Sequence, residues 1–203
     1  GVALTSTAFN EKFSCTIASF DVNNTEPYLI STASLNAKDE RSSYSTPGTS
    51  VWISGYGGEF GVTDPAVLST DLHGCDKGFA SSTITNDTNC NYYHAMNGTS
   101  AAAPTISGAI ALILEANPNL TWRDVKHILA STATQIDSSF AKNYLGVDIY
   151  KWTTNAAGFK HHPSYGFGKV DIASAVTAAL AYNLGSLGSC LLYTSPSPRD
   201  NSG

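Results

Sequence analysis

Apolar positions along the chain fall into short runs separated by long polar stretches. The apolar runs at 28–35 and 51–53 are bounded by turn-forming residues and predict two buried strands. A longer apolar segment, 100–116, follows a run of small residues and predicts a helix. The segments 122–133 and 172–183 repeat their apolar positions at helical spacing, so they predict two further helices.

Helix boundaries are marked by capping and breaking residues. The Asn-Pro-Asn sequence at 117–119 ends the first helix, because proline cannot continue it. Thr121 is placed to cap the second helix, with Asp124 three positions later in a relative of the capping box. Asp171 is placed to cap the third helix. The expected apolar faces are Trp122, Val125, Ile128 and Leu129 in the second helix and Ile172, Ala175, Val176 and Ala179 in the third.

The polar stretches predict loops. Residues 1–27 and 145–170 carry no clear period, and 55–61 holds four glycines. The polar excursion over 62–92 is expected to be a surface loop that helps to frame a cleft, because so long a loop in a compact domain is often functional. The sequence contains no internal repeat.

Length and composition indicate one domain of 203 residues that is large enough to bury a core. Charged residues make up only 13%, which favours a secreted protein, or one of the periplasm or secretory-pathway lumen. The net charge of −5 gives no reason to expect nucleic acid as a partner. No stretch is expected to form a transmembrane segment, since none reaches about 18 apolar residues. The chain begins without Met, so we expect it to be cut from a longer protein, with any signal upstream.

The candidate chemistry centres on 97–104, where a small turn places Ser100 at the start of the predicted helix. Gly98 lets the backbone bend tightly, and alanines keep bulk away from the hydroxyl. Free N–H groups at a helix start favour a developing oxyanion, as a nucleophilic serine requires. The alternative is that this turn merely caps a helix.

The longer string resembles the nucleophile motif of subtilisin-like serine proteases (peptidase S8), and its Ala-Ala-Ala-Pro form is most like the kexin/furin branch. The segments 114–125 and 164–171 resemble the family's following helix and its closing Tyr-Gly-Phe-Gly turn. Upstream, 30–35 and Tyr44-Ser45 resemble a strand and a Tyr-Ser element of the same domain. The resemblance extends over about 15–182.

The resemblance implies an α/β fold of three layers, with a mostly parallel sheet and helices on both faces. Residues 1–185 would form the C-terminal part of the catalytic domain. Residues 186–203 would be a linker, a disordered tail or a sequence foreign to the natural protein, and they do not resemble the family's P domain.

The implied function is that of a serine endopeptidase acting on polypeptides through an acyl-enzyme on Ser100. The family order is Asp, then His, then Ser, and neither partner motif precedes Ser100 here. Gly1 matches the last glycine of the family's oxyanion element, and none of the five histidines stands in the family's setting. We therefore expect the isolated chain to be inactive. The alternative is a non-catalytic fragment that at most binds peptides.

Specificity for basic residues is implied by Asp21, which resembles an acidic position of the family's S1 pocket. The alternative for Asp21 is a solvated loop carboxylate. Asn97 and Thr99, beside the nucleophile, are expected to contact substrate. Calcium is a candidate structural ion, but no ligands are assigned, because Thr46 replaces the glutamate of the family's calcium site near S1.

Four cysteines, Cys15, Cys75, Cys90 and Cys190, lack zinc-site spacing. A disulfide between Cys75 and Cys90 would close a polar loop and contribute about 3 kcal/mol in an oxidising compartment. The resemblance leaves an alternative open, in which the partner of Cys75 lies far upstream. The family bond of Cys15 is expected to be absent, because 46–48 holds no cysteine.

Overall fold

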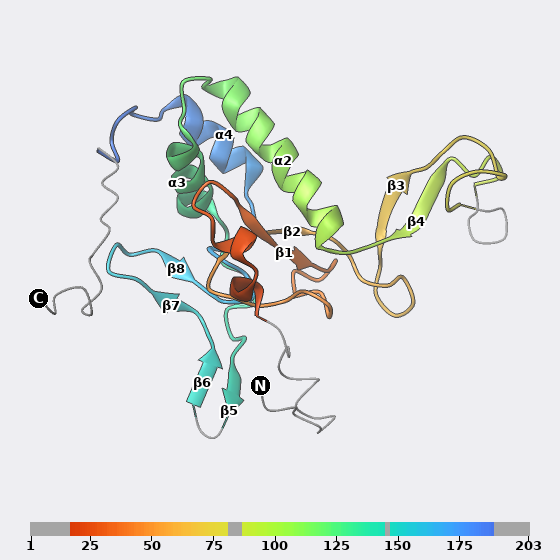
Figure 1. The fold of residues 1–203 in the computed structure, drawn as a ribbon, viewed down its shortest axis with the longest axis horizontal. Coiled ribbons are helices and arrows are strands. Elements are labelled where there is room, and N and C mark those ends of the chain that lie inside the picture. Colours follow the sequence, from red (N-terminus) through yellow and green to blue (C-terminus); the bar gives the residue numbers. More distant parts are fainter. Residues whose placement is uncertain (1–16, 81–86, 145–146, 189–203) are drawn as a thin grey trace, which may run out of the picture.

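The computed structural model describes residues 17–80, 87–144 and 147–188. Its centre is a parallel pair of strands, β1 (Ser31–Leu35) and β2 (Val51–Tyr56). Both strands are buried along most of their length (Figure 1), as expected for parallel strands covered by other elements. The two predicted strands are thereby confirmed, and β2 extends three residues further than its apolar run.

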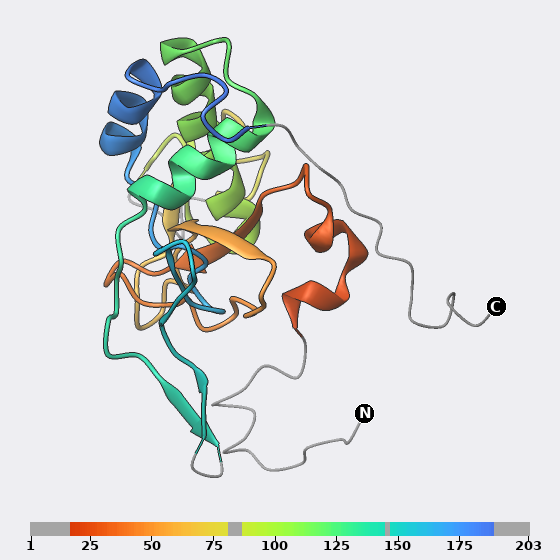
Figure 2. The same ribbon diagram turned by 90° about the vertical axis from the view of Figure 1, so that its left-hand side faces the viewer.

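Three helices gather beside this pair: α2 (Thr99–Ala116), α3 (Trp122–Thr132) and α4 (Ile172–Leu180). Figures 1 and 2 show the helices together at one end of the molecule, and α2 contacts both strands. The three predicted helices are thus confirmed. The parallel strand pair and the helices packed beside it agree with part of the expected α/β fold.

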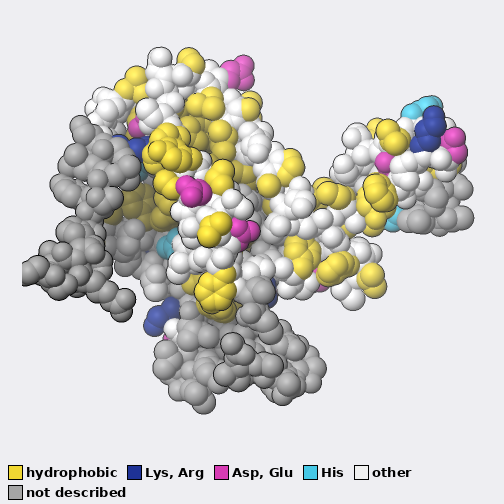
Figure 3. All heavy atoms as spheres, viewed as in Figure 1, with side chains coloured by type: hydrophobic (Ala, Val, Ile, Leu, Met, Phe, Trp, Pro, Cys, Tyr) yellow, Lys and Arg dark blue, Asp and Glu magenta, His cyan; other side chains and the backbone are white. Residues whose placement is uncertain are grey.

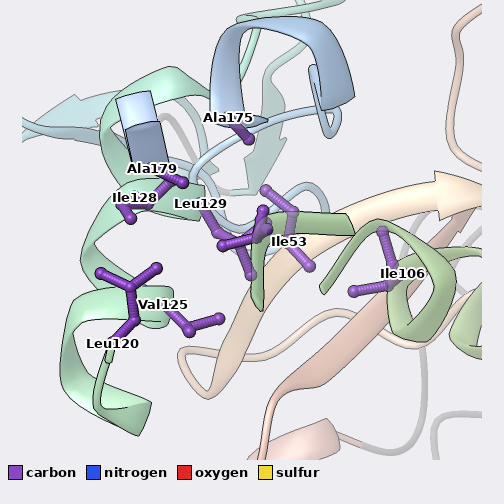
Figure 4. Packing of buried hydrophobic residues seen from close by; sticks show 9 residues of the cluster. Ile53, Ile106, Leu120, Val125, Ile128, Leu129, Ala175 and Ala179 are labelled. Atoms are coloured by element: carbon purple, nitrogen blue, oxygen red, sulfur yellow. The ribbon is translucent and has the colours of Figure 1, made fainter. Parts of the chain in front are cut away.

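The main hydrophobic core lies where the helices meet β2. Figure 4 shows side chains from four elements converging there, with Ile53 of β2 near the centre. Each fully buried leucine or isoleucine stabilises the fold by about 1.5–3 kcal/mol. The cluster consists of Ile53, Ile106, Ile113, Leu120, Val125, Ile128, Leu129, Ala175 and Ala179.

The predicted caps form at both shorter helices. The Thr121 side chain accepts a hydrogen bond from the Asp124 N–H, and the Asp124 carboxylate accepts one from the Thr121 N–H at 2.8 Å. These bonds lower the pKa of Asp124 against the opposing effect of its burial, which is the larger single contribution. Asp171 accepts from the Ser174 N–H at 2.9 Å. Both caps satisfy N–H groups that a helix start leaves free.

Two expected loops contain regular structure instead. The excursion 62–92 holds one strand and leads into another, and the two form an antiparallel arm. The expectation of an irregular 145–170 is also wrong, because short antiparallel pairs form there. These strands have two to five residues each, too few to show a clear alternation of apolar and polar positions. The additional elements are η1 (Ala18–Phe20), η2 (Val22–Thr25), β3 (Val67–Thr70), β4 (Tyr92–Met96), β5 (Lys142–Tyr144), β6 (Val147–Tyr150), β7 (Thr153–Thr154) and β8 (Lys160–His161).

The outer edge of β2 is covered by the turn at 165–170. The Ser54 N–H donates to the Gly168 carbonyl at 2.8 Å, and the Val170 N–H donates to the Ser54 carbonyl at 3.0 Å. Gly166 has φ of +63°, and a Cβ there would lie 2.4 Å from the carbonyl group of Trp52. This turn can therefore close against the strand only with glycine at that position.

Apolar side chains of α2 are exposed on both flanks of its buried face. Leu112 and Leu114 are 46% and 37% exposed, and Figure 3 shows hydrophobic side chains gathered over the helical part of the molecule. By length and composition alone, α2 is long and apolar enough to cross a membrane, with mean hydropathy 1.3. A single helix of this kind is weak evidence for a span, so the absence of a transmembrane segment stays an expectation. Core helices of soluble proteins meet the same criteria, and the inner face of α2 packs on both strands.

A buried aromatic cluster surrounds His162. The ring centroid of Tyr165 lies 4.9 Å from that of His162, and Phe140 and Trp152 lie at 5.4 Å. The Ser164 N–H donates to Nδ1 of His162 at 2.9 Å, so this nitrogen carries no proton. Burial lowers the pKa of His162 to about 4.

We expect this histidine to make the fold sensitive to acid. In the unfolded chain His162 takes up a proton near pH 6.5, whereas in the folded chain it does so only near pH 4. The unfolded state therefore binds more protons between these values, and stability falls as pH falls through them, by about 2–3 kcal/mol. Urea unfolding at pH 7, 5.5 and 4 measures this loss.

The variant His162→Asn provides the control. Its amide oxygen takes the position of Nδ1 and can still accept from the Ser164 N–H, but the side chain does not titrate. We expect its stability to depend less steeply on pH than that of the unaltered chain. Equal slopes for the two proteins would contradict the assignment.

Candidate active site

Ser100 is the second residue of α2 and is exposed. The preceding Gly98 has φ of +114°, a conformation that favours glycine, and begins the helix. The first helical hydrogen bonds run from the N–H groups of Ala101 and Ala102 to the Gly98 carbonyl, at 2.9 and 3.3 Å. The Ser100 N–H therefore lies ahead of the helical ladder, at the positive end of the helix dipole.

Pro104 lies one turn further along the same helix. It has no N–H to donate to the carbonyl of Ser100, so the first turn lacks one regular bond. Thr105 and Ser107 instead donate their hydroxyls to the carbonyls of Ala101 and Ala103, at 3.3 and 3.0 Å. Side-chain hydrogen bonds within α2 thus add to the backbone bonds near its start.

Glycines of β2 and the following turn let α2 approach closely. A Cβ on Gly55 would lie 3.3 Å from the Ala102 carbonyl oxygen. A Cβ on Gly57 would lie 2.4 Å from the Gly98 carbonyl oxygen, which excludes any side chain there. The Gly98 N–H donates to the Gly57 carbonyl at 3.1 Å and to the Tyr44 hydroxyl at 2.8 Å. The turn before Ser100 is therefore joined directly to the backbone that follows β2.

A pocket of about 540 Å³ opens beside Ser100. Its walls come from five regions: η1 and η2, the start of β1, the segment around Tyr44, the start of β2, and the first turn of α2. The volume is in the range of small ligand sites. The lining residues are Ile17, Ala18, Asp21, Asn24, Ile30, Ser31, Thr32, Tyr44, Thr46, Val51, Thr99, Ser100 and Ala103.

Three of the four candidate site residues meet at this pocket. Ser100, Thr99 and Asp21 line it, whereas Asn97 does not. The Asp21 carboxylate is exposed and accepts a hydrogen bond from the Asn23 N–H at 3.0 Å, which caps η2. Asp21 therefore has a local structural role and also presents a negative charge to the pocket.

The remaining pocket residues were not singled out as substrate contacts from the sequence. Tyr44 and Thr46 stood in a segment noted for its resemblance, but their position beside Ser100 depends on the path of the loop. Ile17, Ala18 and Val51 carry no chemical signal in the sequence, so only the fold could identify them.

None of the five histidines, all of which lie within the described residues, lines the pocket. His73 is bonded to Asn91 at 2.8 Å and His161 to the Val51 carbonyl at 2.9 Å. The described residues contain no group of three or more His, Cys, Asp or Glu side chains that could hold a metal ion. Cys15, Cys190 and Gly1 lie outside the described residues.

The arm formed by β3 and β4 leads directly into the short turn at 97–98 that precedes α2 and Ser100. The structure joins Cys75 to Cys90 by a disulfide, with 4.9 Å between the Cα atoms. Asp71 accepts from the Ala80 and Phe79 N–H groups, at 2.6 Å each, and these bonds lower the pKa of its carboxyl. Figure 1 shows the arm projecting from the body, and none of its described residues lines the pocket. The expectation that 62–92 frames the cleft is therefore wrong.

An α/β fold with an exposed serine at the start of a central helix is an arrangement used by serine hydrolases. The subtilase family model matches residues 10–168, and the chain belongs to this family.

Known proteins agree with this membership. The chain is 36% identical over 200 residues to the extracellular serine protease of Aeromonas sobria, covering 88% of this chain and 32% of the relative. It is 37% identical over 142 residues to human proprotein convertase subtilisin/kexin type 7, covering 67% of this chain and 16% of that one. The crystal structure of the Aeromonas sobria protease with its chaperone superposes with a TM-score of 0.69 at 35% identity, over 75% of this chain and 29% of that one.

The chain thus spans about a third of the length of its Aeromonas relative. The two named relatives are a serine protease and a proprotein convertase, which agrees with the resemblance found in the motifs.

The disulfide is expected to order the arm rather than the helical core. Reduction with dithiothreitol should accelerate amide exchange in β3 and β4, while amides of α3 and α4 keep their protection. A crosslink over a loop of this size contributes about 3 kcal/mol, so exchange in the arm should rise by about 100-fold.

A double variant with Cys75→Ser and Cys90→Ser supplies the control. It should exchange rapidly in the arm with or without the reductant. If the reductant leaves arm exchange unchanged in the unaltered chain, the disulfide does not hold the arm.

Proposed function

We propose that this chain carries the nucleophile of a serine endopeptidase, which cleaves polypeptides through an acyl-enzyme on Ser100. The observation that carries the proposal is the exposed Ser100 at the start of α2, beside a pocket that also holds Asp21. Membership in the subtilase family and the serine protease relatives support the same chemistry.

In the proposed reaction the Ser100 hydroxyl oxygen attacks the carbonyl carbon of the scissile peptide bond. A histidine outside this chain removes the hydroxyl proton and later delivers it to the leaving amine. The Ser100 N–H donates to the oxyanion that develops, at the positive end of the α2 dipole. Water then hydrolyses the ester and restores the serine.

We propose that residues 1–185 are the C-terminal part of a catalytic domain, with the tail at 186–203 outside it. The exposed apolar side chains of α2 support this division, because a central helix in a complete α/β domain is covered on both sides. No histidine of the described residues lines the pocket beside Ser100, which agrees with a catalytic domain that extends beyond this chain.

Asp21 is the proposed anchor for a basic substrate residue. Its carboxylate would accept charge-assisted hydrogen bonds from an arginine or lysine before the cut. The resemblance to the kexin/furin branch and the convertase relatives favour this preference. Thr99 and Asn97 would contact the substrate backbone near the nucleophile.

The compartment that suits this protein is outside the cytosol. A relative is named as an extracellular protease, and the Cys75–Cys90 pair requires oxidising conditions. Calcium stays a proposed structural ion, bound by oxygen ligands that the chain does not identify.

A second candidate is an inactive protease-like fragment that binds peptides in the same pocket. The specific observation in its favour is that no histidine of the described chain lines the pocket. The two candidates differ in what happens to a serine-directed probe.

The isolated 203-residue chain is expected to react at most slowly with a fluorophosphonate probe, since no base activates Ser100. A complete catalytic domain that contains this chain should label rapidly at Ser100. In-gel fluorescence and peptide mass spectrometry measure the labelling, with Ser100→Ala as the control. Fast labelling of the isolated chain would show that a base is present after all, and failure of the complete domain to label would overturn the endopeptidase.

In the complete domain, Asp21→Asn should lower kcat/KM for substrates with arginine before the cut by about 10- to 100-fold, because a charge-assisted bond is lost. A matched substrate with leucine at that position should be little affected. The control Glu26→Gln removes a nearby exposed carboxylate that does not line the pocket beside Ser100. If both substrates change equally, Asp21 has no part in specificity.

A further inference from the structure

The hydroxyl of Tyr44 lies at the junction between the nucleophile turn and the end of β2. It accepts a hydrogen bond from the Gly98 N–H at 2.8 Å. It also lies 2.8 Å from the Gly57 carbonyl and 2.7 Å from the Gly58 carbonyl. A single side-chain oxygen therefore connects the backbone before Ser100 to the backbone after β2.

The hydrogen-bonding capacity of a phenol limits how these contacts are shared. Tyr44 has one proton to donate and two lone pairs that accept. Each of the two carbonyls has one other donor, the Gly98 N–H at 3.1 Å for Gly57 and the Ser42 hydroxyl at 2.8 Å for Gly58. The Tyr44 proton can go to either carbonyl, and in both arrangements the Tyr44 oxygen accepts from the Gly98 N–H.

Buried serine side chains form hydrogen bonds with Tyr44 and with the residues on either side of it. The Ser34 hydroxyl lies 2.9 Å from both the Tyr44 and the Ser42 hydroxyls, and the Ser34 N–H donates to Ser45 Oγ at 3.0 Å. All three serines are buried. A buried network in which every member is bonded fixes its groups firmly.

The segment that carries Tyr44 is also held from outside. The Glu59 carboxylate accepts from the Ser43 N–H at 2.6 Å and from the Ser43 hydroxyl at 2.8 Å. The Tyr44 ring meets the Phe60 ring edge-on, with 5.6 Å between centroids. The position of Tyr44 is therefore fixed by contacts that do not involve the turn at Gly98.

We propose that Tyr44 is a positioning residue for Ser100. By holding the Gly98 N–H, its hydroxyl fixes the peptide between Asn97 and Gly98. Gly98 is conformationally permissive, at φ of +114°, so an external bond decides how the chain enters α2. The direction of the Ser100 hydroxyl and N–H follows from that entry. The catalytic consequence of this inference rests on the proposed function. The hydrogen bond between Tyr44 and Gly98 does not depend on it.

The first test replaces Tyr44 by phenylalanine in the complete catalytic domain. Tyr44→Phe keeps the ring and removes the hydroxyl. We expect kcat and the rate of phosphonylation of Ser100 to fall about tenfold, which corresponds to the loss of one hydrogen bond. KM should stay within about twofold, since the pocket wall is retained.

Tyr56→Phe is the matched control. It also removes a bonded phenol hydroxyl, one that contacts Asp39 and the Lys169 amine, away from Ser100. Thermal unfolding of both variants should change similarly, whereas only Tyr44→Phe should slow the reaction. If the two variants lose rate equally, or if Tyr44→Phe keeps full rate, the proposal is overturned.

The second test does not depend on activity. Amide exchange at Gly98 should become about tenfold faster in Tyr44→Phe, because one of the two acceptors of this N–H is lost, while Ala175 in α4 keeps its protection. Unchanged exchange at Gly98 overturns the inference. Faster exchange in a complete domain whose Ser100 never reacts would keep Tyr44 as the residue that holds the turn and overturn the endopeptidase instead.

Discussion

The contact between the end of β2 and the start of α2 determines where Ser100 lies. Gly57 admits the turn before the helix at a distance that no side chain would allow, and a Cβ on Gly55 would lie only 3.3 Å from the Ala102 carbonyl oxygen. The Gly98 N–H closes this contact on the Gly57 carbonyl. Because β2 is itself held by the turn at 165–170 on its outer edge and by the core on its face, the position of Ser100 is inherited from the packing of the whole helical layer.

Two buried groups make that packing specific. The helical layer is apolar and tolerates hydrophobic exchange of similar volume. The aromatic cluster around His162, by contrast, requires a neutral imidazole, and the serine network beneath Tyr44 requires all its hydroxyls. Such polar centres contribute less to stability than to the choice of one arrangement over others. They lie on opposite sides of β2 in the chain, before and after it.

Local rules in the sequence predicted much of this molecule. The helices were found because apolar spacing, Thr121 and Asp171 all indicated the same boundaries. The arm was missed because its strands are short, lie next to polar stretches and pair only with each other. At the site, Ser100 and Asp21 carry chemical signals, whereas the role of Tyr44 depends on which backbone groups the loop brings to its hydroxyl. That proximity is a tertiary property, which no spacing encodes.

The hydrogen bond between Gly98 and Gly57 joins two main-chain groups. Substitutions of side chains around the pocket therefore leave its donor and acceptor in place. Asp21 and the η1–η2 wall of the pocket belong to a different segment from Gly57, Gly98 and Tyr44, which hold the turn before Ser100. Under the proposed function, substrate preference and the position of the nucleophile would therefore depend on separable parts of the chain. Substitutions in one pocket wall would then change the preferred substrate while the position of Ser100 stays fixed.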